Sequence, residues 1–488
     1  MEADRGYADG PLRGTVVRET LWNAAGAYSG LAVQLVVTAI LARLLSPADF
    51  GVVAAVVAFT AFFEVVAEQG LVGAVLQRRD LTEADLSGVF WLALAAGAVL
   101  YLVLYGGVSL LGGLFETRGF NAVLRILGLN VLLVALLVVP KAILRRRLEL
   151  RRLSMARLAG VAAGAAAAIP LALSMRGHWA LVGQSLAGYG TELLAVSWFA
   201  RWRPRLEIRP RVSGPVARFS LSMFFQIAVN YWSRGAGSLL IARFGAAPLG
   251  EFNLAQRLVA IPMQLLWSAL GPMLHPAYAI MGDDLPRLRA AYSDLLQLTG
   301  ILSLPMAAVL GLSADRLVPL LWGPQWTASI LLVYALLPVA AVQPLSAVGA
   351  PLFMARDRTG LMLRVTVFNA GALLAAMALG LRWGAAGVAW GYSIAYLCIA
   401  FPCACGVVQA RVLRGTLREL AAWLWRPLAT CAIVLAGGWA ARVSVGSAPP
   451  LVGLLAIASA SLLAWGIALR ALSWPLVLSV ARARAGGP

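Results

Sequence analysis

Long apolar segments recur along the whole of this 488-residue chain, and no other feature limits its fold so strongly. Hydrophobic residues make up 61% of the sequence, charged residues make up only 12%, and the mean hydropathy is +0.83. A soluble domain carries roughly 25% charged residues, because its surface must face water. A chain of this composition cannot bury its apolar side chains in one water-facing core. We therefore expect a polytopic membrane protein of the all-α class.

About fourteen segments are apolar enough to cross a bilayer as helices, each of which needs about 20 residues. They lie at residues 20–42, 50–72, 86–111, 121–140, 158–175, 179–200, 219–241, 249–273, 291–312, 326–350, 361–381, 385–408, 423–441 and 451–469. The ends of the second and eighth segments are the least well defined, because both contain charged residues. A solution with twelve spans is the alternative.

Positive charge is distributed unevenly among the loops between these segments. With the N-terminus in the cytoplasm, about 30 of the Lys and Arg residues fall on the cytoplasmic side and 8 on the outer side. Membrane proteins carry such an excess in their cytoplasmic loops. The alternation predicts that both termini are cytoplasmic.

A net charge of +19 can also indicate nucleic-acid binding. We expect no nucleic-acid partner, because the arginines lie between apolar runs rather than on a soluble domain.

Two short joints between apolar segments resemble each other and lie about 200 residues apart. The stretches "ILARLLSPADFGVVA" and "LIARFGAAPLGEFNLA" each contain an arginine, a turn with proline, and then a glycine, Gly51 or Gly250. The segment 201–218 is rich in proline and lacks helical periodicity, which is typical of a linker. We predict an N-lobe at 1–200, a cytoplasmic linker at 201–218, a C-lobe at 219–410 and two extra spans within 411–488. Parallel repeats of this kind place a substrate path between them.

Charged side chains inside the predicted spans are candidates for function, because a bilayer makes them costly. They are Glu64 and Glu68 in the second span, Glu192 in the sixth, Arg234 in the seventh and Arg257 in the eighth. The acids could bind a coupling ion or could form structural ion pairs. The two arginines are expected at similar depth, where they would repel each other unless an anion binds between them. Guanidinium groups suit phosphate, whose oxygens match their fork of donors.

Amide side chains accompany these charges in the first, seventh and eighth spans. Gln34, Asn230, Asn253 and Gln256 are the candidates for lining a hydrated cavity. No glycine-rich phosphate loop with a lysine is present, and no outer loop is long enough for a glycosyltransferase or polymerase site. The four cysteines lie in apolar stretches and lack the usual spacing of metal ligands. We expect a transporter rather than an enzyme, with no metal and no cofactor.

Several longer stretches resemble one family. The stretch "RETLWNAAGAYSGLAVQLVVTAILARLLSPADFGVVAAVVAFTAFF" resembles the N-terminus of the bacterial polysaccharide flippases of the Wzx type. The stretches "EQGLVGAVLQRRDLTEADLSGVFW", "NYWSRGAGSLLIARFGAAPLGEFNLAQRLVAIP" and "LWGPQWTAS" are similar to later parts of that family. The resemblance covers roughly residues 15–410. It implies the fold of the multidrug/oligosaccharidyl-lipid/polysaccharide exporters, with two pseudo-symmetric lobes in the cytoplasmic membrane of a bacterium.

The substrate that the resemblance implies is an oligosaccharide linked to polyprenyl diphosphate. Alternating access would carry it to the outer leaflet for exopolysaccharide, capsule or O-antigen (lipopolysaccharide) synthesis. Its diphosphate and sugars would then bind Arg234, Arg257, Asn230, Gln34, Gln256 and Asn253. Membrane lipids are the other expected partners, together with a polysaccharide polymerase and glycosyltransferases.

One departure from the family affects the proposed site. The family pattern leads us to expect R-N-A-D-N where this chain has R-G-A-G-S, so Gly237 replaces an acid. That change weakens the case for a coupling ion at this position and leaves Arg234 without a balancing charge in its own span. Two alternatives of the same fold remain open from the sequence, a multidrug-type exporter, which Glu64 and Glu68 would favour, and a lipid II flippase. A membrane glycosyltransferase or polymerase, the alternative from another class, would need a long outer loop, which this sequence lacks.

Overall fold

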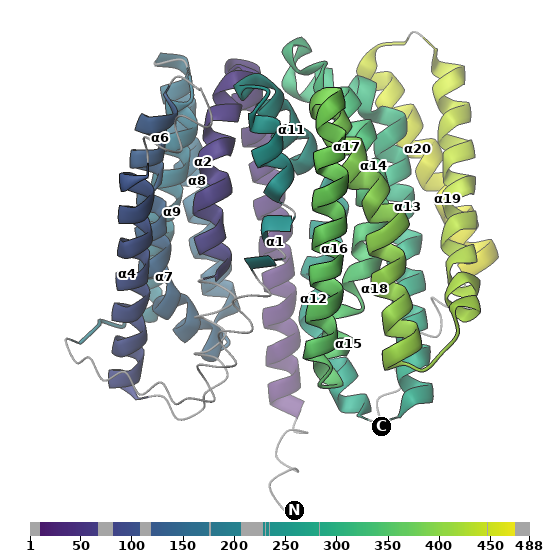
Figure 1. The fold of residues 1–488 in the computed structure, drawn as a ribbon, viewed down its shortest axis with the longest axis horizontal. Helices are drawn as coiled ribbons and strands as arrows, with labels where there is room; N and C mark the ends of the chain where they lie inside the picture. Colours follow the sequence, from purple (N-terminus) through teal and green to yellow (C-terminus); the bar gives the residue numbers. More distant parts are fainter. Residues whose placement is uncertain are drawn as a thin grey trace, which may run out of the picture. The chain divides into compact units, whose positions relative to one another are not determined.

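The computed structural model describes residues 10–66, 82–107, 119–174, 177–205, 228–229, 231–233, 235–282, 284–446 and 448–473. All regular structure within these ranges is helical, as the composition predicts (Figure 1). Each of the fourteen predicted spans overlaps a helix wherever its residues are described. Eight of the described helical stretches are long and apolar enough to cross a membrane, and shorter apolar helices lie at Tyr28–Leu44 and Pro47–Phe62. The stretch Thr359–Val412 contains two predicted spans.

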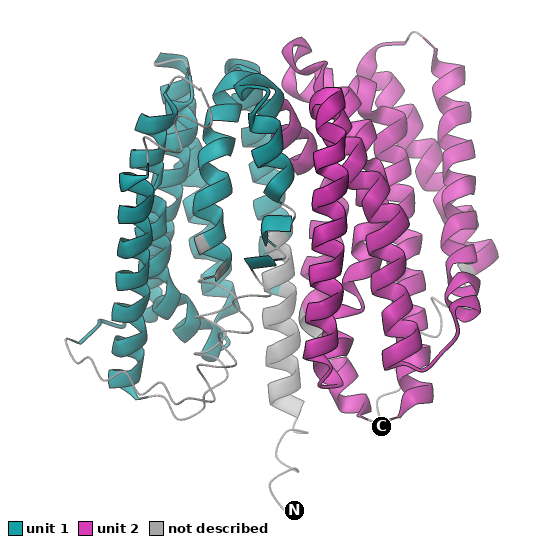
Figure 2. Ribbon diagram, in the orientation of Figure 1, with its two compact units in different colours: residues 1–250 teal, residues 251–488 magenta. Residues whose placement is uncertain are grey.

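The chain divides into two compact units, residues 1–250 and 251–488 (Figure 2). The helices that begin in the first unit are α1 (Gly10–Leu44), α2 (Pro47–Val66), α4 (Glu83–Gly106), α6 (Phe120–Leu127), α7 (Leu129–Arg146), α8 (Leu150–Ser174), α9 (Trp179–Ala200) and α11 (Ala246–Val259). A further helix, called here the 228–242 helix, is described at 228–229, 231–233 and 235–242. It packs on α2. The predicted lobe boundary at 201–218 lies earlier in the chain and stays a prediction.

The second unit is also helical throughout its described residues. Its elements are α12 (Ile261–Met281), α13 (Leu285–Trp322), η2 (Pro324–Trp326), α14 (Ser329–Ala347), α15 (Ala350–Ala355), α16 (Thr359–Gly380), η3 (Leu381–Trp383), α17 (Gly384–Ala395), η4 (Tyr396–Ala400), α18 (Phe401–Val407), η5 (Val408–Val412), α19 (Leu417–Val445), α20 (Pro450–Ala468) and η6 (Leu469–Ser473). The segments η4, η5 and η6 are π-helical. The two C-terminal helices α19 and α20 pack on each other and on α13.

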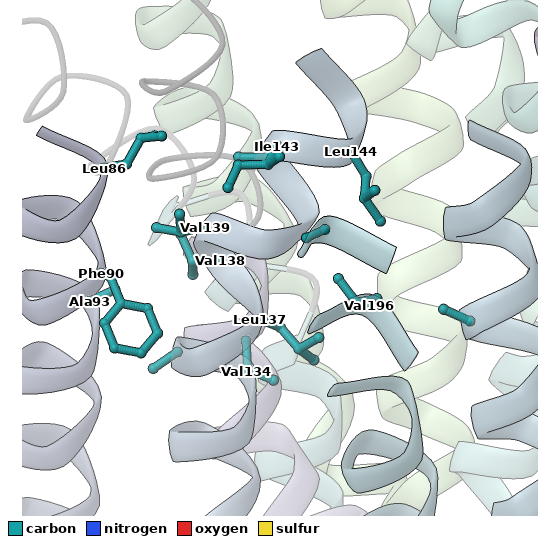
Figure 3. Packing of buried hydrophobic residues seen from close by; sticks show 14 of the residues in the cluster. Leu86, Phe90, Ala93, Val134, Leu137, Val138, Val139, Ile143, Leu144 and Val196 are labelled. Carbon is teal, nitrogen blue, oxygen red and sulfur yellow. The ribbon is translucent and has the colours of Figure 1, made fainter. Parts of the chain in front are cut away.

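Glycines bring the helices of the first unit close together. Gly160 and Gly164 lie four residues apart on α8, so they share one face of that helix. A Cβ atom on either glycine would press against a backbone carbonyl of α9, at Gly188 or Gln184. Small residues at this spacing allow helices to approach closely inside membranes. Buried side chains of α4, α7, α8 and α9 form a hydrophobic core, in which Phe90 of α4 and Val196 of α9 lie to either side of α7 residues such as Val138 (Figure 3).

The two joints that resemble each other in sequence contact each other in space. A Cβ atom on Gly51 would overlap the carbonyl oxygen of Ala246, and one on Gly250 would overlap the carbonyl oxygen of Pro47. Gly51 and Gly250 are the equivalent glycines of the two joints. Their contacts are therefore reciprocal, as expected for two segments related by a two-fold axis. Only glycine allows the first turns of α2 and α11 to cross this closely.

Loops predicted for the same side of the membrane meet in the first unit. At the arginine-rich end, Arg147 donates a hydrogen bond to the carbonyl of Ala200 (3.0 Å), and the indole of Trp202 donates to Glu83 (2.9 Å). These contacts join three loops that were all predicted to be cytoplasmic. At the opposite end, His178 Nδ1 lies 3.7 Å from Asp49 Oδ1. That contact joins two loops that were predicted to be outside.

In the second unit, too, loops that were predicted for the same side of the membrane contact each other. At the arginine-rich end, Arg289 donates to the carbonyl of Leu413 (2.8 Å), which joins the start of α13 to the loop after η5. At the other end, the guanidinium of Arg442 pairs with Asp315 (2.8 Å), and Arg316 donates to the carbonyl of Gly446 (2.7 Å). The alternation that the charges predict therefore agrees with the loop contacts inside each unit.

Candidate functional site

Arg257 lies on a polar face of α11 and α12. Asn253, Arg257 and Gln264 are four and seven residues apart, so they follow one face of the two consecutive helices. Arg257 and Gln264 are exposed, and Asn253 is half-buried. Away from this face, Leu254 and Leu258 of α11 are buried in protein. The two consecutive helices thus present a guanidinium group and two amides on one face while other side chains of α11 pack in the protein.

The charge of Arg257 is not balanced by an acid among the described residues. Its Nε donates a hydrogen bond to Oδ1 of Asn253 at 3.2 Å, and it forms no ion pair within the described ranges. The amide orients the guanidinium without neutralising it. Gln256 is half-buried on an adjoining face of the same helix. The arrangement can donate several parallel hydrogen bonds to an anion.

An aromatic cluster lies between α2 and the 228–242 helix. The ring centroids of Phe62 lie 5.4 Å from Tyr231 and 5.5 Å from Trp232, and Phe59 lies 6.0 Å from Trp232. The Tyr231 hydroxyl donates a hydrogen bond to the carbonyl of Ala58 at 2.7 Å, which holds the two helices together. The four rings form a continuous group of flat apolar surfaces with one hydroxyl.

Two further polar side chains of the first unit lie on helices α1 and α2. Glu64 is half-buried on α2 and lies near enough to Tyr231 for an electrostatic interaction between them. Gln34 is exposed on α1, although Gly30 and Thr38, one turn before and after it on the same face, are buried. The Gln34 amide is therefore exposed between two buried positions of α1.

Glu192 forms an ion pair with Lys141. The Nζ atom of Lys141 lies 2.7 Å from Oε1 of Glu192, and the two side chains are 20% and 12% exposed. This contact is the structural pairing that the sequence left open for Glu192, with a lysine as the partner. The charge distribution groups Lys141 with the cytoplasmic residues that follow the fourth predicted span. The apolar residues on both sides of it, from Val131 to Leu144, are the signal that it lies inside a helix.

Three of the predicted site residues, Arg234, Asn230 and Glu68, lie outside the described residues. Their roles stay predictions. Within the described ranges, no three His, Cys, Asp or Glu side chains gather into a group that could hold a metal ion. All four cysteines are free thiols, and Cys405 is buried whereas Cys398 is exposed.

Known proteins resemble this chain in both sequence and fold. It is 26% identical over 432 residues to the lipopolysaccharide biosynthesis protein WzxC of Escherichia coli (strain K12), with 85% of each chain covered. It is 28% identical over 313 residues to the succinoglycan biosynthesis transport protein ExoT of Rhizobium meliloti (strain 1021), with 64% of this chain and 63% of the relative covered.

Two solved structures share the fold at low sequence identity. The lipid II flippase MurJ in an inward closed conformation has a TM-score of 0.74 and 12% identity, covering 92% of this chain and 99% of that chain. An outward-facing multidrug resistance MATE family transporter of the MOP superfamily has a TM-score of 0.58 and 15% identity, covering 84% and 96%. Residues 40–331, more than half of the chain, match the family described as polysaccharide biosynthesis protein. The chain belongs to that family.

Proposed function

We propose that this protein is a flippase that moves oligosaccharides linked to polyprenyl diphosphate across the bacterial cytoplasmic membrane. Its family and the transport role in the name of ExoT support a function in polysaccharide export. The fold that it shares with a lipid II flippase supports movement of a lipid-linked substrate. A multi-pass membrane protein of this family has no need of catalytic groups for that task. Polymerase and glycosyltransferase partners are part of the proposal.

The observation that carries the proposal is the unbalanced charge of Arg257. An arginine on a membrane helix costs free energy, which a structural ion pair or a charged ligand must offset. The described residues supply an amide from Asn253 and no carboxylate. A diphosphate offers several oxygens that match the donor fork of the guanidinium. We infer that the diphosphate of the substrate binds Arg257, with Arg234 as the second cation.

Sugar rings require a different surface, and the aromatic cluster provides one. Pyranose rings present apolar C–H faces and polar edges. The rings of Phe59, Phe62, Tyr231 and Trp232 can contact such faces, while Gln34 is an accessible amide for hydroxyl groups. Because flat rings contact any pyranose in a similar way, this surface favours oligosaccharides as a class over one particular sugar.

The membrane potential contributes to the direction of transport. Moving one negative charge outward across an inside-negative membrane releases about 2.3 kcal/mol per 100 mV. A diphosphate headgroup carries more than one such charge. The potential can therefore drive net outward transport without a bound coupling ion, and Gly237 at the position of the family's acid is in keeping with this. Glu64 and Glu68 remain the candidates for a coupling site.

A second candidate function is export of organic cations. The specific observation in its favour is the aromatic cluster beside Glu64, because aromatic faces and a carboxylate together bind flat cations well. The fold of the MATE transporter is compatible with that function. Arg257 argues against it, because a cation would be repelled by an unbalanced guanidinium.

Reconstitution into liposomes tests the two candidates together. The purified chain is inserted into vesicles that carry a fluorescent polyprenyl-diphosphate oligosaccharide, and an added glycosidase reports the fraction of sugar on the outer surface. We expect the protein to increase that fraction with time and to leave a neutral glycolipid of the same sugar unmoved. Efflux of ethidium from loaded vesicles is measured in parallel. Ethidium efflux without movement of the diphosphate-linked sugar would contradict the proposal.

A further inference from the structure

The second unit contains a basic cavity at its arginine-rich end. The cavity has a volume of about 810 Å³ and lies between the start of α16 and the end of η5. The side chains and backbone that line it come from Asp357, Arg358, Gly360, Leu361, Arg364, Val407, Ala410, Arg411 and Arg414. Four arginines and a single aspartate thus surround one space. The two groups of residues lie about 50 positions apart in the sequence.

The positive charge of this cavity is not neutralised by other parts of the described chain. The guanidinium groups of Arg358, Arg364, Arg411 and Arg414 are exposed, and none of them has an ion pair or side-chain hydrogen bond within the described ranges. The first turn of α16 adds to the positive potential of the cavity. Arg358 occupies the N-cap position of this helix, and no side chain caps its free N–H groups. Helix N-termini carry partial positive charge and free N–H donors. Both features favour an anion.

The backbone around the cavity is held in place by side chains that do not line it. Arg289 donates hydrogen bonds to the carbonyls of Leu413 and Arg414, so its guanidinium holds the backbone on one side of the cavity. Gln409 Nε2 donates to Glu419 at 2.8 Å, which ties η5 to the first turn of α19. Arg411 and Arg414 therefore project from a backbone that these contacts hold in place.

The cavity lies at the N-terminal end of an exposed apolar face of α16. Helix α16 has 22 residues and is about 33 Å long, enough to cross the hydrocarbon core with its first turn at the interface. From Arg364 onward, the same face continues with Val367, Phe368 and Leu374, which are 51%, 58% and 41% exposed. Exposed apolar side chains on a membrane helix contact acyl chains. A ligand can therefore place a charged group in the cavity and an acyl chain along α16.

We propose that this cavity binds the phosphate of an anionic glycerophospholipid, with the acyl chains along the exposed face of α16. The arginine-rich end of the unit is cytoplasmic by the positive-inside rule, and the cytoplasmic leaflet is rich in anionic lipids. Basic recesses between membrane helices suit such headgroups. The site lies wholly within the second unit and uses no residue of the proposed transport site. The lipid proposal therefore does not depend on the proposed flippase function.

Lipid binding to the purified full chain tests the proposal. Native mass spectrometry measures the occupancy of phosphatidylglycerol and of phosphatidylcholine at equal concentration. We expect a clear preference for phosphatidylglycerol in the natural protein. The double variant Arg364→Gln/Arg411→Gln should lower the affinity for phosphatidylglycerol by about 10-fold or more, because it removes two charge-assisted contacts. The matched control is Arg382→Gln, an exposed arginine just beyond the other end of α16, which should retain the preference.

A second variant protects the test against misfolding. A side chain added at Gly360 meets open space, and an acid in the first turn of a helix is favourable. Gly360→Glu should therefore fold normally yet abolish the lipid preference, whereas Gly360→Gln should retain it. Equal binding of the two lipids by the natural protein would overturn the proposal. So would a preference that survives in both Gly360→Glu and the double arginine variant.

Competitors distinguish the sources of phosphate. Inorganic phosphate at about millimolar concentration should leave phosphatidylglycerol bound, because it gains nothing from the exposed apolar face of α16. Its displacement of the lipid would show a site for soluble phosphate and overturn the lipid assignment. Polyprenyl diphosphate should likewise fail to displace phosphatidylglycerol at equal concentration. Full displacement would assign the cavity to the transported substrate and would also overturn the proposal.

Discussion

Two basic side chains on membrane helices, one in each unit, differ in how their charge is balanced. Lys141 of α7 pairs with Glu192 of α9 at 2.7 Å, and both groups are largely buried. Arg257 of α11 is exposed and has only the neutral amide of Asn253 as a partner among the described residues. The first charge is satisfied inside the protein and joins two helices. The second remains available to a ligand.

The chemistry of the two side chains fits this difference. The ammonium group of lysine is a compact charge that one carboxylate can satisfy in a small space. The guanidinium group has five donors in a rigid plane, of which Asn253 uses one. Replacing either member of the first pair should therefore affect stability, whereas replacing Arg257 should affect transport. The predictions below test that division.

Arg257→Gln should have the largest effect on transport. Removing a charge-assisted contact to phosphate costs about 1.5 to 3 kcal/mol, which corresponds to about a 10- to 100-fold slower movement of the lipid-linked sugar. The thermal unfolding temperature should change little, because no acid depends on this arginine within the described residues. The vesicle assay and a thermal melt measure both quantities. Arg257→Lys should keep part of the activity. A rate equal to that of the natural protein in Arg257→Gln would refute the role of this residue.

Glu192→Gln should lower stability by about 2 to 3 kcal/mol, because it leaves the ammonium of Lys141 without a countercharge in a mostly buried place. The double variant Lys141→Met/Glu192→Leu should recover most of that loss, since neither charge then remains. Denaturation of the detergent-solubilised protein measures the free energy of unfolding. Once folded, both variants should move substrate at nearly the natural rate. A stable Glu192→Gln variant that cannot transport would instead identify Glu192 as a coupling residue.

The sequence predicted the helical segments because they depend on local composition. Each predicted span needed only a run of apolar residues, and the side assignments, which rest on the arginines beside each span, stay predictions. The similarity of the joints around Gly51 and Gly250 was also visible in the sequence, although their contact in space was not. These predicted features involve one segment or one repeated pattern at a time.

Contacts between distant segments could not be predicted in the same way. Lys141 and Glu192 are 51 positions apart, and only the packing of α7 on α9 brings them together. The basic cavity combines residues near 360 with residues near 411, which the sequence presents merely as two cytoplasmic loops. By contrast, the spacing of Asn253 and Arg257 on one helix was visible in the sequence. The candidate site was therefore predictable where it lies along a helix.

A smaller effect on transport should result from giving Arg257 a carboxylate partner, as Lys141 already has. Asn253→Asp places a carboxylate where the amide oxygen now lies, 3.2 Å from Nε of Arg257. An acid four residues before an arginine on a helix stabilises by roughly 0.2 to 0.5 kcal/mol, so the folded state should be unchanged or slightly more stable. Transport should fall by about 3- to 10-fold, because the substrate's phosphate must now compete with a fixed carboxylate for the same guanidinium.

The matched variant Asn253→Ala separates charge from orientation. It removes the hydrogen bond without adding a charge, so it should slow transport less than Asn253→Asp does. The vesicle assay compares the two variants at equal protein content. If both slow transport equally, Asn253 acts by orienting Arg257, and the balance of charge is not what matters. If Asn253→Asp transports at the natural rate, the free charge of Arg257 is not used, and the contrast with Lys141 has no functional meaning.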